Sequence, residues 1–396
     1  MLHRIYLSPG LFGFGQLASY DYFVHLEQGL VERLQAAGDD VRAYVADVAP
    51  TASIRRRSAC LSDLVSRTDG EHGQAGVIHL IGHSTGGLDA RLVATPFAAV
   101  PHTLDPRPWL PRLASVTTIN TPHFGTPLAT MFATVSGQRL LEALSALTFI
   151  ALSLGSPPLA AASAVVVAFS RVDHALGLDV AILDRAIQAL LSVLDDTRSR
   201  EVRVYLNAIR SDQGSILQLS PEGMDLFQAG VGDRPGVLYQ CTASMAPPPS
   251  PATLRSVLVR PWSVLSKVIF ATLYGATSRS DERYPCSATS VERQAEEVLC
   301  RAFGRVPGVR ANDGVVPLRS QLWGKLVWAG YADHHDVLGH FRDDSRDSSR
   351  PGPTPPHVDW LSSGSSFGRQ EFSNMIDAIA TGLLAGARKL ALDPAR

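Results

Sequence analysis

The chain has 396 residues, of which 45% are hydrophobic and 18% are charged, and its formal net charge is −1. This composition provides for a large core, and the lack of a strongly basic or acidic region argues against nucleic-acid binding driven by phosphate charge. A zinc site is not expected, because no metal-ligand spacing occurs among the four cysteines, Cys60, Cys241, Cys286 and Cys300. A Cys286–Cys300 disulfide is left open.

The first residues enter a strand pattern at 3–8 without an apolar h-region or a small-residue cleavage site. A secretory signal is therefore not visible. We expect a cytoplasmic protein, unless the chain leaves the cell by a route that the sequence does not show.

Strand and helix patterns alternate over the first third of the chain. A loop rich in glycine follows the first strand at 8–15, and the triplet Arg55-Arg56-Arg57 is interpreted as a solvated helix face. This alternation predicts an α/β fold with a mostly parallel central sheet flanked by helices. We assign residues 1–127 to the first part of this core, with strands at 3–8, 41–47, 77–81 and 114–120 and helices at 21–37, 52–67 and 85–94.

Residues 128–200 are almost entirely helix-like, and no charged residue occurs between Ala143 and Ser170. Gly155-Ser156-Pro157-Pro158 divides this stretch into two pieces that are too short to span a bilayer. We therefore expect an inserted helical cap. It either lifts to expose an apolar surface, which suits lipid substrates and transient contact with a lipid interface, or stays buried.

Residues 201–396 form the second part of the core in this interpretation. Residues 253–300 are mixed and mostly helical, and residues 342–357 read as a long flexible surface loop. We expect strands at 202–209, 236–242 and 325–329 and a final amphipathic helix at 370–390.

One motif indicates chemistry. Gly82-His83-Ser84-Thr85-Gly86 is a G-x-S-x-G between a strand pattern and a helix pattern. Such a turn holds its serine in a strained conformation above the sheet, at the positive end of the following helix. Ser84 is therefore the candidate nucleophile, and the alternative is a serine in an ordinary polar turn.

A serine nucleophile needs a general base and an orienting carboxylate, which follow it in the order acid, then histidine. Asp313 lies in an Asn-Asp-Gly turn and is the candidate acid, although it could serve only to stabilise that turn. His334 follows a predicted strand and is the candidate base, with His335 as the alternative.

The oxyanion of an acyl-transfer reaction needs two N–H donors. We expect them to come from Thr85, directly after the nucleophile, and from Leu11 in the glycine-rich loop. His79, in the strand before the motif, is expected to be a hydrogen-bonded core histidine, and His123 to shape the loop after its strand.

In combination these segments resemble the bacterial triacylglycerol lipases of the α/β-hydrolase superfamily, the group that includes the Pseudomonas and Burkholderia lipases. The likeness spans residues 9–336 in the family's order. It is carried by Pro9-Gly10-Leu11-Phe12-Gly13, by 44–50 (YVADVAP), by 80–91 (LIGHSTGGLDAR), by 115–125 (SVTTINTPHFG), and by 312–317 (NDGVVP) followed by His334-His335-Asp336.

The resemblance implies an α/β-hydrolase fold, with Ser84 as nucleophile, Asp313 as acid, His334 as base and Leu11 and Thr85 at the oxyanion positions. It also implies a structural calcium ion near the histidine, with Asp336 as one ligand; Asp281 is only a guess for a second. The first loop departs from the family, because Pro9-Gly10 replaces its usual His-Gly. The family's signal peptide and disulfide have no clear counterpart.

These observations predict a serine hydrolase of carboxylic esters, either a lipase or an esterase, that requires no cofactor. An acyltransferase, or a hydrolase of polyesters, amides or thioesters, would use the same three residues. A catalytically silent binding protein of the same fold is the alternative from a different class.

Overall fold

The computed structural model describes most of the chain. The predicted loop at 342–357, Asp281, Cys286 and the break at 155–158 fall wholly or largely outside the described residues. Cys300 is a free thiol. The described residues are 1–11, 16–17, 20–72, 75–154, 159–171, 180–249, 261–279, 282–284, 290–343, 357–359 and 361–392.

In the part of the chain that the structure describes, six strands form one parallel sheet in the order β4-β1-β5-β6-β7-β8. β1 lies between two neighbours, with Ile5 opposite Ala43 of β4 and His79 of β5. The predicted α/β architecture with a parallel central sheet is therefore confirmed. The strands are β1 (Leu2–Ser8), β4 (Asp40–Val45), β5 (Val77–His83), β6 (Leu113–Ile119), β7 (Leu238–Met245) and β8 (Lys325–Tyr331).

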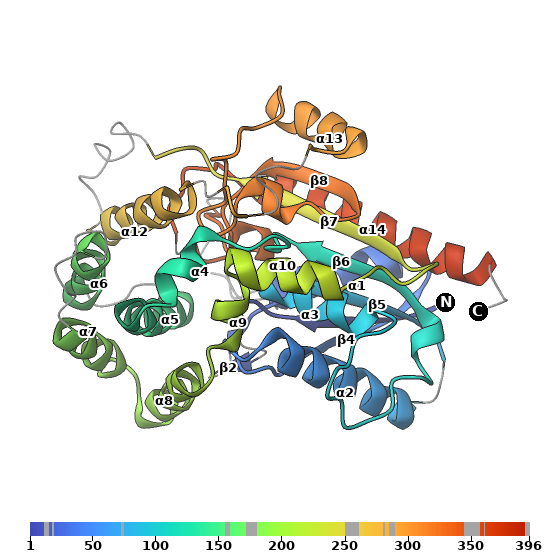
Figure 1. Ribbon diagram of the computed structural model, residues 1–396, viewed down its shortest axis with the longest axis horizontal. Coiled ribbons are helices and arrows are strands. Elements are labelled where there is room, and N and C mark those ends of the chain that lie inside the picture. Colours follow the sequence, from blue (N-terminus) through green and yellow to red (C-terminus); the bar gives the residue numbers. More distant parts are fainter. Residues whose placement is uncertain are drawn as a thin grey trace.

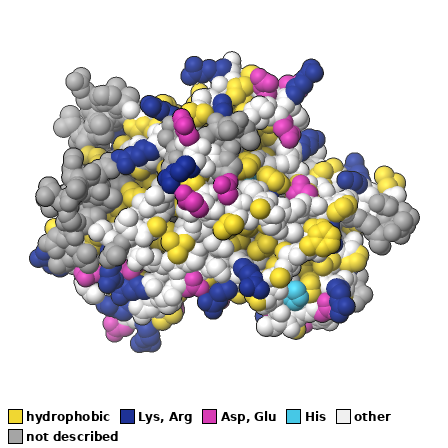
Figure 2. Space-filling view, viewed as in Figure 1, with side chains coloured by type: hydrophobic (Ala, Val, Ile, Leu, Met, Phe, Trp, Pro, Cys, Tyr) yellow, Lys and Arg dark blue, Asp and Glu magenta, His cyan; other side chains and the backbone are white. Residues whose placement is uncertain are grey.

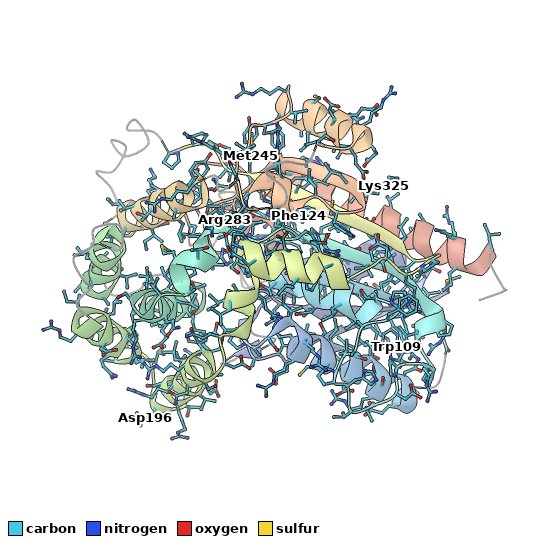
Figure 3. All side chains as sticks on the ribbon, viewed as in Figure 1. Trp109, Phe124, Asp196, Met245, Arg283 and Lys325 are labelled. Atoms are coloured by element: carbon cyan, nitrogen blue, oxygen red, sulfur yellow. The ribbon has the colours of Figure 1, made fainter. Side chains whose placement is uncertain are left out.

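Helices cover both faces of the sheet (Figure 1). Successive residues of a strand point to opposite faces. Ile5 and Leu7 of β1 accordingly pack with α1 (Val24–Ala36) and α14 (Arg369–Leu392), whereas Tyr6 packs with α2 (Ile54–His72) and α3 (Thr85–Ala94). This sandwich fixes the strand ends that carry the site. Figure 3 labels Met245 at the carboxyl end of β7 and Phe124 in the loop after β6.

A second apolar core lies outside the sheet and joins a group of helices that Figure 1 shows to the left of the strands. Buried Leu140, Leu144 and Phe149 of α5 pack there against residues of α6, α7, α8 and α12. The helical character predicted for 128–200 is thus confirmed for the described residues of this range. The helices are α4 (Pro127–Phe132), α5 (Val135–Leu154), α6 (Leu159–Arg171), α7 (Val180–Leu191), α8 (Asp196–Ser211) and α12 (Pro261–Thr277).

The strand predicted at 202–209 is wrong, because these residues belong to α8. Its buried residues are Val202, Tyr205, Leu206 and Ile209, a spacing of three and four residues that places them on one side of a helix. Asp195 begins the helix by accepting a hydrogen bond from the backbone N–H of Arg198.

The remaining described elements are short or lie at the edges of the fold. The described helices include none that combines the length and apolar character needed to cross a bilayer. In Figure 2, apolar side chains on the visible face lie in small groups between charged ones. The elements are β2 (Gln16–Leu17), β3 (Tyr20–Asp21), α9 (Gly214–Gln218), α10 (Pro221–Gly230), α13 (Arg293–Phe303), η1 (Leu110–Arg112), η3 (Leu318–Gln321) and η4 (Asp336–Leu338).

Candidate active site

Ser84 lies on the sharp turn that the motif predicted, between the end of β5 at His83 and the start of α3 at Thr85. Its backbone has φ 53° and ψ −130°, a strained conformation for a residue with a side chain. The turn requires glycine at 86, since a Cβ there would lie 2.0 Å from the carbonyl oxygen of Ser8. Strand and helix therefore approach closely, and the serine is held at the N-terminal end of α3.

The loop after β1 lies directly over Ser84. A Cβ on Gly10 would come within 2.7 Å of Ser84 Cβ and 3.2 Å of Ser84 Oγ, so only glycine fits without displacement. Leu11 follows Gly10 in the chain, and Thr85 follows Ser84 as the first residue of α3. The residues predicted as oxyanion donors, Leu11 and Thr85, are thus the chain neighbours of Gly10 and Ser84.

Asp313 and His334 meet although they are 21 residues apart. His334 Nδ1 lies 2.7 Å from Asp313 Oδ2, and both side chains are buried. The backbone N–H of His334 also donates to the carbonyl oxygen of Asp313 at 3.0 Å. Of the two candidate histidines, His334 is therefore the one that contacts the acid. Its ring forms no hydrogen bond with Ser84 Oγ in this structure, although both residues are described; such bonds often tighten only with substrate.

His83 joins the serine turn to the loop that carries His334. Its Nε2 lies 2.9 Å from the carbonyl oxygen of His334, and its Nδ1 lies 2.7 Å from the phenol oxygen of Tyr22. A carbonyl oxygen only accepts, so Nε2 carries the proton and Nδ1 accepts from Tyr22. Burial lowers the pKa of His83 well below its usual value, which keeps this neutral form. No local pattern indicates this bridge, because Tyr22 and His83 are 61 residues apart.

Arg57 is a second residue that sequence reasoning missed. The prediction of a solvated helix face is wrong for Arg57, which is fully buried and forms an ion pair with Asp89 at 2.8 Å. The prediction is confirmed for Arg55 and Arg56, which are exposed. The Arg57 guanidinium also donates to the carbonyl oxygen of Pro9. It therefore anchors the loop that covers Ser84. Periodicity along α2 is the signal that could have found it, since buried Leu61 lies four residues further on.

The other two histidines behave as predicted. His79 Nε2 lies 2.9 Å from His3 Nδ1, and its Nδ1 lies 2.7 Å from Ser115 Oγ, all within the buried sheet. His123 lies between Arg91 at 3.1 Å and Thr118 at 3.0 Å and shapes the loop after β6. Neither contacts the candidate catalytic side chains.

The calcium ion that the resemblance implies, with Asp336 as one ligand, stays a prediction. Oδ2 of Asp336 already accepts hydrogen bonds from the backbone N–H of Asp333 and the hydroxyl of Ser365. Within the described ranges, no three His, Cys, Asp or Glu side chains are grouped to hold a metal ion. Burial raises the pKa of Asp336 well above its usual value, that of nearby Asp333 to about 6 and that of Asp359 to about 8.

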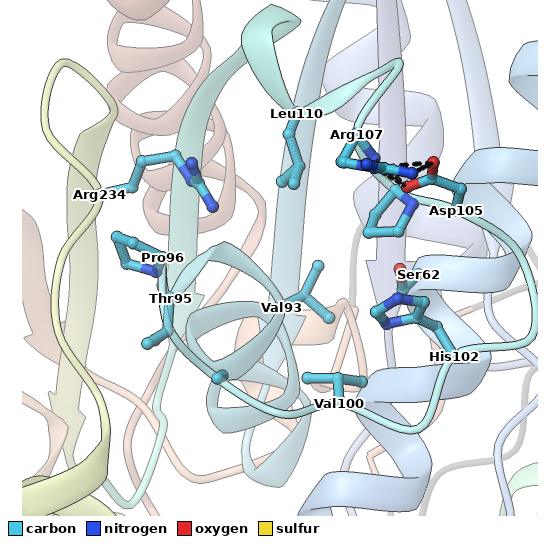
Figure 4. A pocket seen from close by; sticks show the side chains of 12 residues that line it. Ser62, Val93, Thr95, Pro96, Val100, His102, Asp105, Arg107, Leu110 and Arg234 are labelled. Atoms are coloured by element: carbon cyan, nitrogen blue, oxygen red, sulfur yellow. Dashed lines mark hydrogen bonds and ion pairs between the residues drawn. The ribbon is translucent and has the colours of Figure 1, made fainter.

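A cavity of about 460 Å³ opens at the other end of α3 (Figure 4). Val93 and Leu110 line it, and at its rim Arg107 is paired with Asp105. Val93 is the ninth residue after Ser84, so this wall of the cavity lies roughly 13 Å from Ser84 along the helix axis. It is therefore separate from the candidate site.

The parallel sheet, the strained serine turn and the chain order Ser84, Asp313, His334 together are those of an α/β-hydrolase fold. This confirms the predicted fold class.

Comparison with known proteins adds a partial match in sequence. No family model matches the chain. A triacylglycerol lipase of Vibrio cholerae is 38% identical to it over 127 residues, which are 32% of this chain and 35% of that lipase. The chain thus covers about a third of the length of this relative. The predicted resemblance to bacterial triacylglycerol lipases is confirmed for the matched residues.

Two solved structures are similar over nearly the whole chain. A Staphylococcus hyicus lipase has a TM-score of 0.49 at 15% identity, covering 100% of this chain and 97% of its own. EstA from Clostridium botulinum has a TM-score of 0.46 at 21% identity, and the match covers 94% of this chain and 87% of EstA.

Proposed function

We propose that the protein is a serine hydrolase that cleaves carboxylic esters, as a lipase or an esterase, through an acyl-enzyme. The hydrogen bond of 2.7 Å between His334 Nδ1 and Asp313 Oδ2 carries this proposal. This bond orients the imidazole of His334, and its other nitrogen, Nε2, can then accept the proton of Ser84 on the strained turn. His83 supports the arrangement by linking the backbone of His334 to the residue before Ser84.

In the proposed reaction, Ser84 Oγ attacks the ester carbonyl carbon while His334 Nε2 takes the hydroxyl proton. Asp313 stabilises the imidazolium, and the N–H groups of Leu11 and Thr85 bind the oxyanion. The intermediate then collapses, and the alcohol leaves with the proton from His334. A water molecule, deprotonated by the same histidine, attacks the acyl-serine and releases the carboxylic acid and free Ser84.

The apolar helical region supports acyl esters as the substrate class. Leu11 packs against the same core as the buried residues of α5 and α12, so the loop over Ser84 is continuous with that region. An apolar acyl chain beside Ser84 would lie next to this surface. We further propose that this cap makes the transient contact with a lipid interface.

Hydrolysis of p-nitrophenyl esters from short to long acyl chain, with Ser84→Ala beside the parent protein, tests the proposal. We expect turnover that falls in the variant by about 10⁶-fold in kcat. The optimum in chain length would distinguish an esterase from a lipase, and added alcohol acceptors would reveal acyl transfer.

A second measurement uses a fluorophosphonate probe, which reacts with an activated serine. Labelling of the parent but not of Ser84→Ala is the expected result. Absence of both turnover and labelling would overturn the proposal and favour a binding role for the fold.

A further inference from the structure

Asn120, the residue after β6, has an unusual backbone. Its φ is 46°, in the left-handed region. Among the described residues other than glycine, only Ser84, Asn120 and Ser366 have a positive φ. Asparagine tolerates this region better than most residues, at some energetic cost. The side chain is fully buried, so the conformation aims it at a defined interior position.

The side-chain amide of Asn120 has two hydrogen-bond acceptors. Nδ2 donates to Asp313 Oδ2 at 3.0 Å and to Ser244 Oγ at 2.6 Å. The orientation is determined by chemistry, because the reversed amide would place its own oxygen against the carboxylate. Both Nδ2 hydrogens are therefore used, one of them on the candidate catalytic acid.

The carboxylate of Asp313 receives four donors in the structure. Oδ1 accepts from the backbone N–H groups of Val315 at 2.9 Å and Val316 at 2.7 Å, within its own turn. Oδ2 accepts from His334 and from Asn120. Among the described residues, Asn120 is thus the donor that joins this oxygen to the sheet itself rather than to the turn or the base.

We propose that Asn120 is a positioning residue for the acid of the triad, an inference that rests on the proposed function. Its amide fixes the plane of the Asp313 carboxyl group so that Oδ2 faces His334. The same hydrogen bond stabilises the negative charge on Oδ2. The carboxylate therefore stabilises the imidazolium form of His334 less strongly than it would without Asn120. The strained, left-handed backbone at Asn120 directs the side chain towards Asp313 and so makes this contact possible.

The variant Asn120→Gly tests the role without backbone strain, because glycine adopts the left-handed conformation freely. We expect kcat to fall about ten- to hundredfold, the usual effect of losing a hydrogen bond to a charged group. We expect KM to stay unchanged, because the Asn120 side chain is fully buried. The acid limb of the kcat profile moves upward by about 0.5 to 1 pH unit, because the carboxylate has lost a donor.

Asn120→Asp supplies a second, nearly isosteric variant. The introduced carboxyl group can donate to Asp313 only while protonated, since two adjacent carboxylates repel each other. Activity should therefore be partly retained at low pH and lost as the pH rises. Ser244→Ala is the matched control, because it removes the other acceptor of Nδ2 and leaves the bond to Asp313; its pH profile should match that of the parent.

Low-field proton NMR of the His334 Nδ1–H group provides a readout that does not depend on substrate. Its resonance should move in Asn120→Gly and stay in place in Ser244→Ala, with thermal melts showing that each variant is folded. An unchanged resonance and acid limb in folded Asn120→Gly overturn the inference. A parent protein without Ser84-dependent turnover would instead overturn the proposed function, while the NMR comparison still tests Asn120.

Discussion

Arg57 and Asp89 form an ion pair in which neither side chain is exposed, and Ser8 Oγ donates to the same carboxylate at 2.8 Å. Because Arg57 also donates to the carbonyl oxygen of Pro9, the pair connects helices α2 and α3 to the loop over Ser84. In this chain Pro9-Gly10 stands where the resembling lipases have His-Gly. Arg57 and Asp89 therefore supply an anchor that does not depend on a side chain at position 9.

Removal of Arg57 should be strongly destabilising. In Arg57→Met the carboxylate of Asp89 would stay buried without its partner, which typically costs about 3–5 kcal/mol. Urea unfolding monitored by circular dichroism measures the loss. Arg56→Met is the control, because Arg56 is the adjacent residue but is exposed and paired with Asp212 at the surface. It should change stability by less than about 1 kcal/mol.

The double variant Arg57→Met/Asp89→Asn separates the charge from the packing. Since the uncompensated charge is gone, we expect it to recover a large part of the stability lost in Arg57→Met. A double variant that is no more stable than the single one would contradict this account of the pair.

Gly10→Ala should reduce activity far more than stability. Its Cβ would lie 2.7 Å from Ser84 Cβ, so the loop must move and the N–H of Leu11 moves with it. We expect kcat to fall about 10²- to 10³-fold, as for the loss of one oxyanion donor, with a loss of stability of about 1–3 kcal/mol. Gly70→Ala is the control, because a Cβ there meets nothing within 4 Å. Normal activity in Gly10→Ala would refute the proposed position of the oxyanion site.

Stability should fall on mild acidification. Burial lowers the pKa of His79 to about 3, whereas an unfolded histidine titrates near 6.5. Between these values the unfolded state binds the additional proton, so stability is full above about pH 6.5 and is lost as the pH falls towards 3. Each such histidine contributes a slope of about 1.4 kcal/mol per pH unit.

Denaturant unfolding from pH 7.5 to 5 checks this expectation. His79→Gln removes the titrating group and should give a shallower dependence on pH, even though it is less stable at pH 7. His102→Gln alters an exposed histidine and should leave the slope unchanged. Equal slopes in the parent and His79→Gln would show that His79 does not titrate as proposed.

Chelation should leave the activity intact. The carboxylate of Asp336 is already hydrogen-bonded to Asp333 and Ser365, which stabilises the loop after His334 without a metal ion. Dialysis against EDTA, followed by ester hydrolysis and thermal melting with and without added Ca²⁺, measures the effect. Activity that disappears with EDTA and returns with Ca²⁺ would contradict the expectation.

The local sequence pattern was sufficient to predict a helix or strand wherever the residues of that element alone indicated its type. The helix predicted at 85–94 is α3, and the strands expected at 77–81 and 114–120 are β5 and β6, because apolar runs and glycines beside Ser84 leave few alternatives. For residues 202–209 the local pattern predicted a strand where the structure has a helix. A short apolar run is compatible with either type until its packing partners are known.

The sequence by itself predicted the serine turn and the alternation of strands and helices that forms a parallel sheet, because both depend on residue types at short spacing. It also indicated Ser84 as nucleophile and Asp313 as acid, and it left His334 and His335 as alternatives for the base. Only the tertiary structure decided that His334 rather than His335 meets Asp313, that Asn120 donates to the same carboxylate, and that Arg57 is buried and donates to Pro9. Asn120 and Asp313 are 193 residues apart. Contacts of this kind join segments that are far apart in the sequence, and no local pattern encodes them.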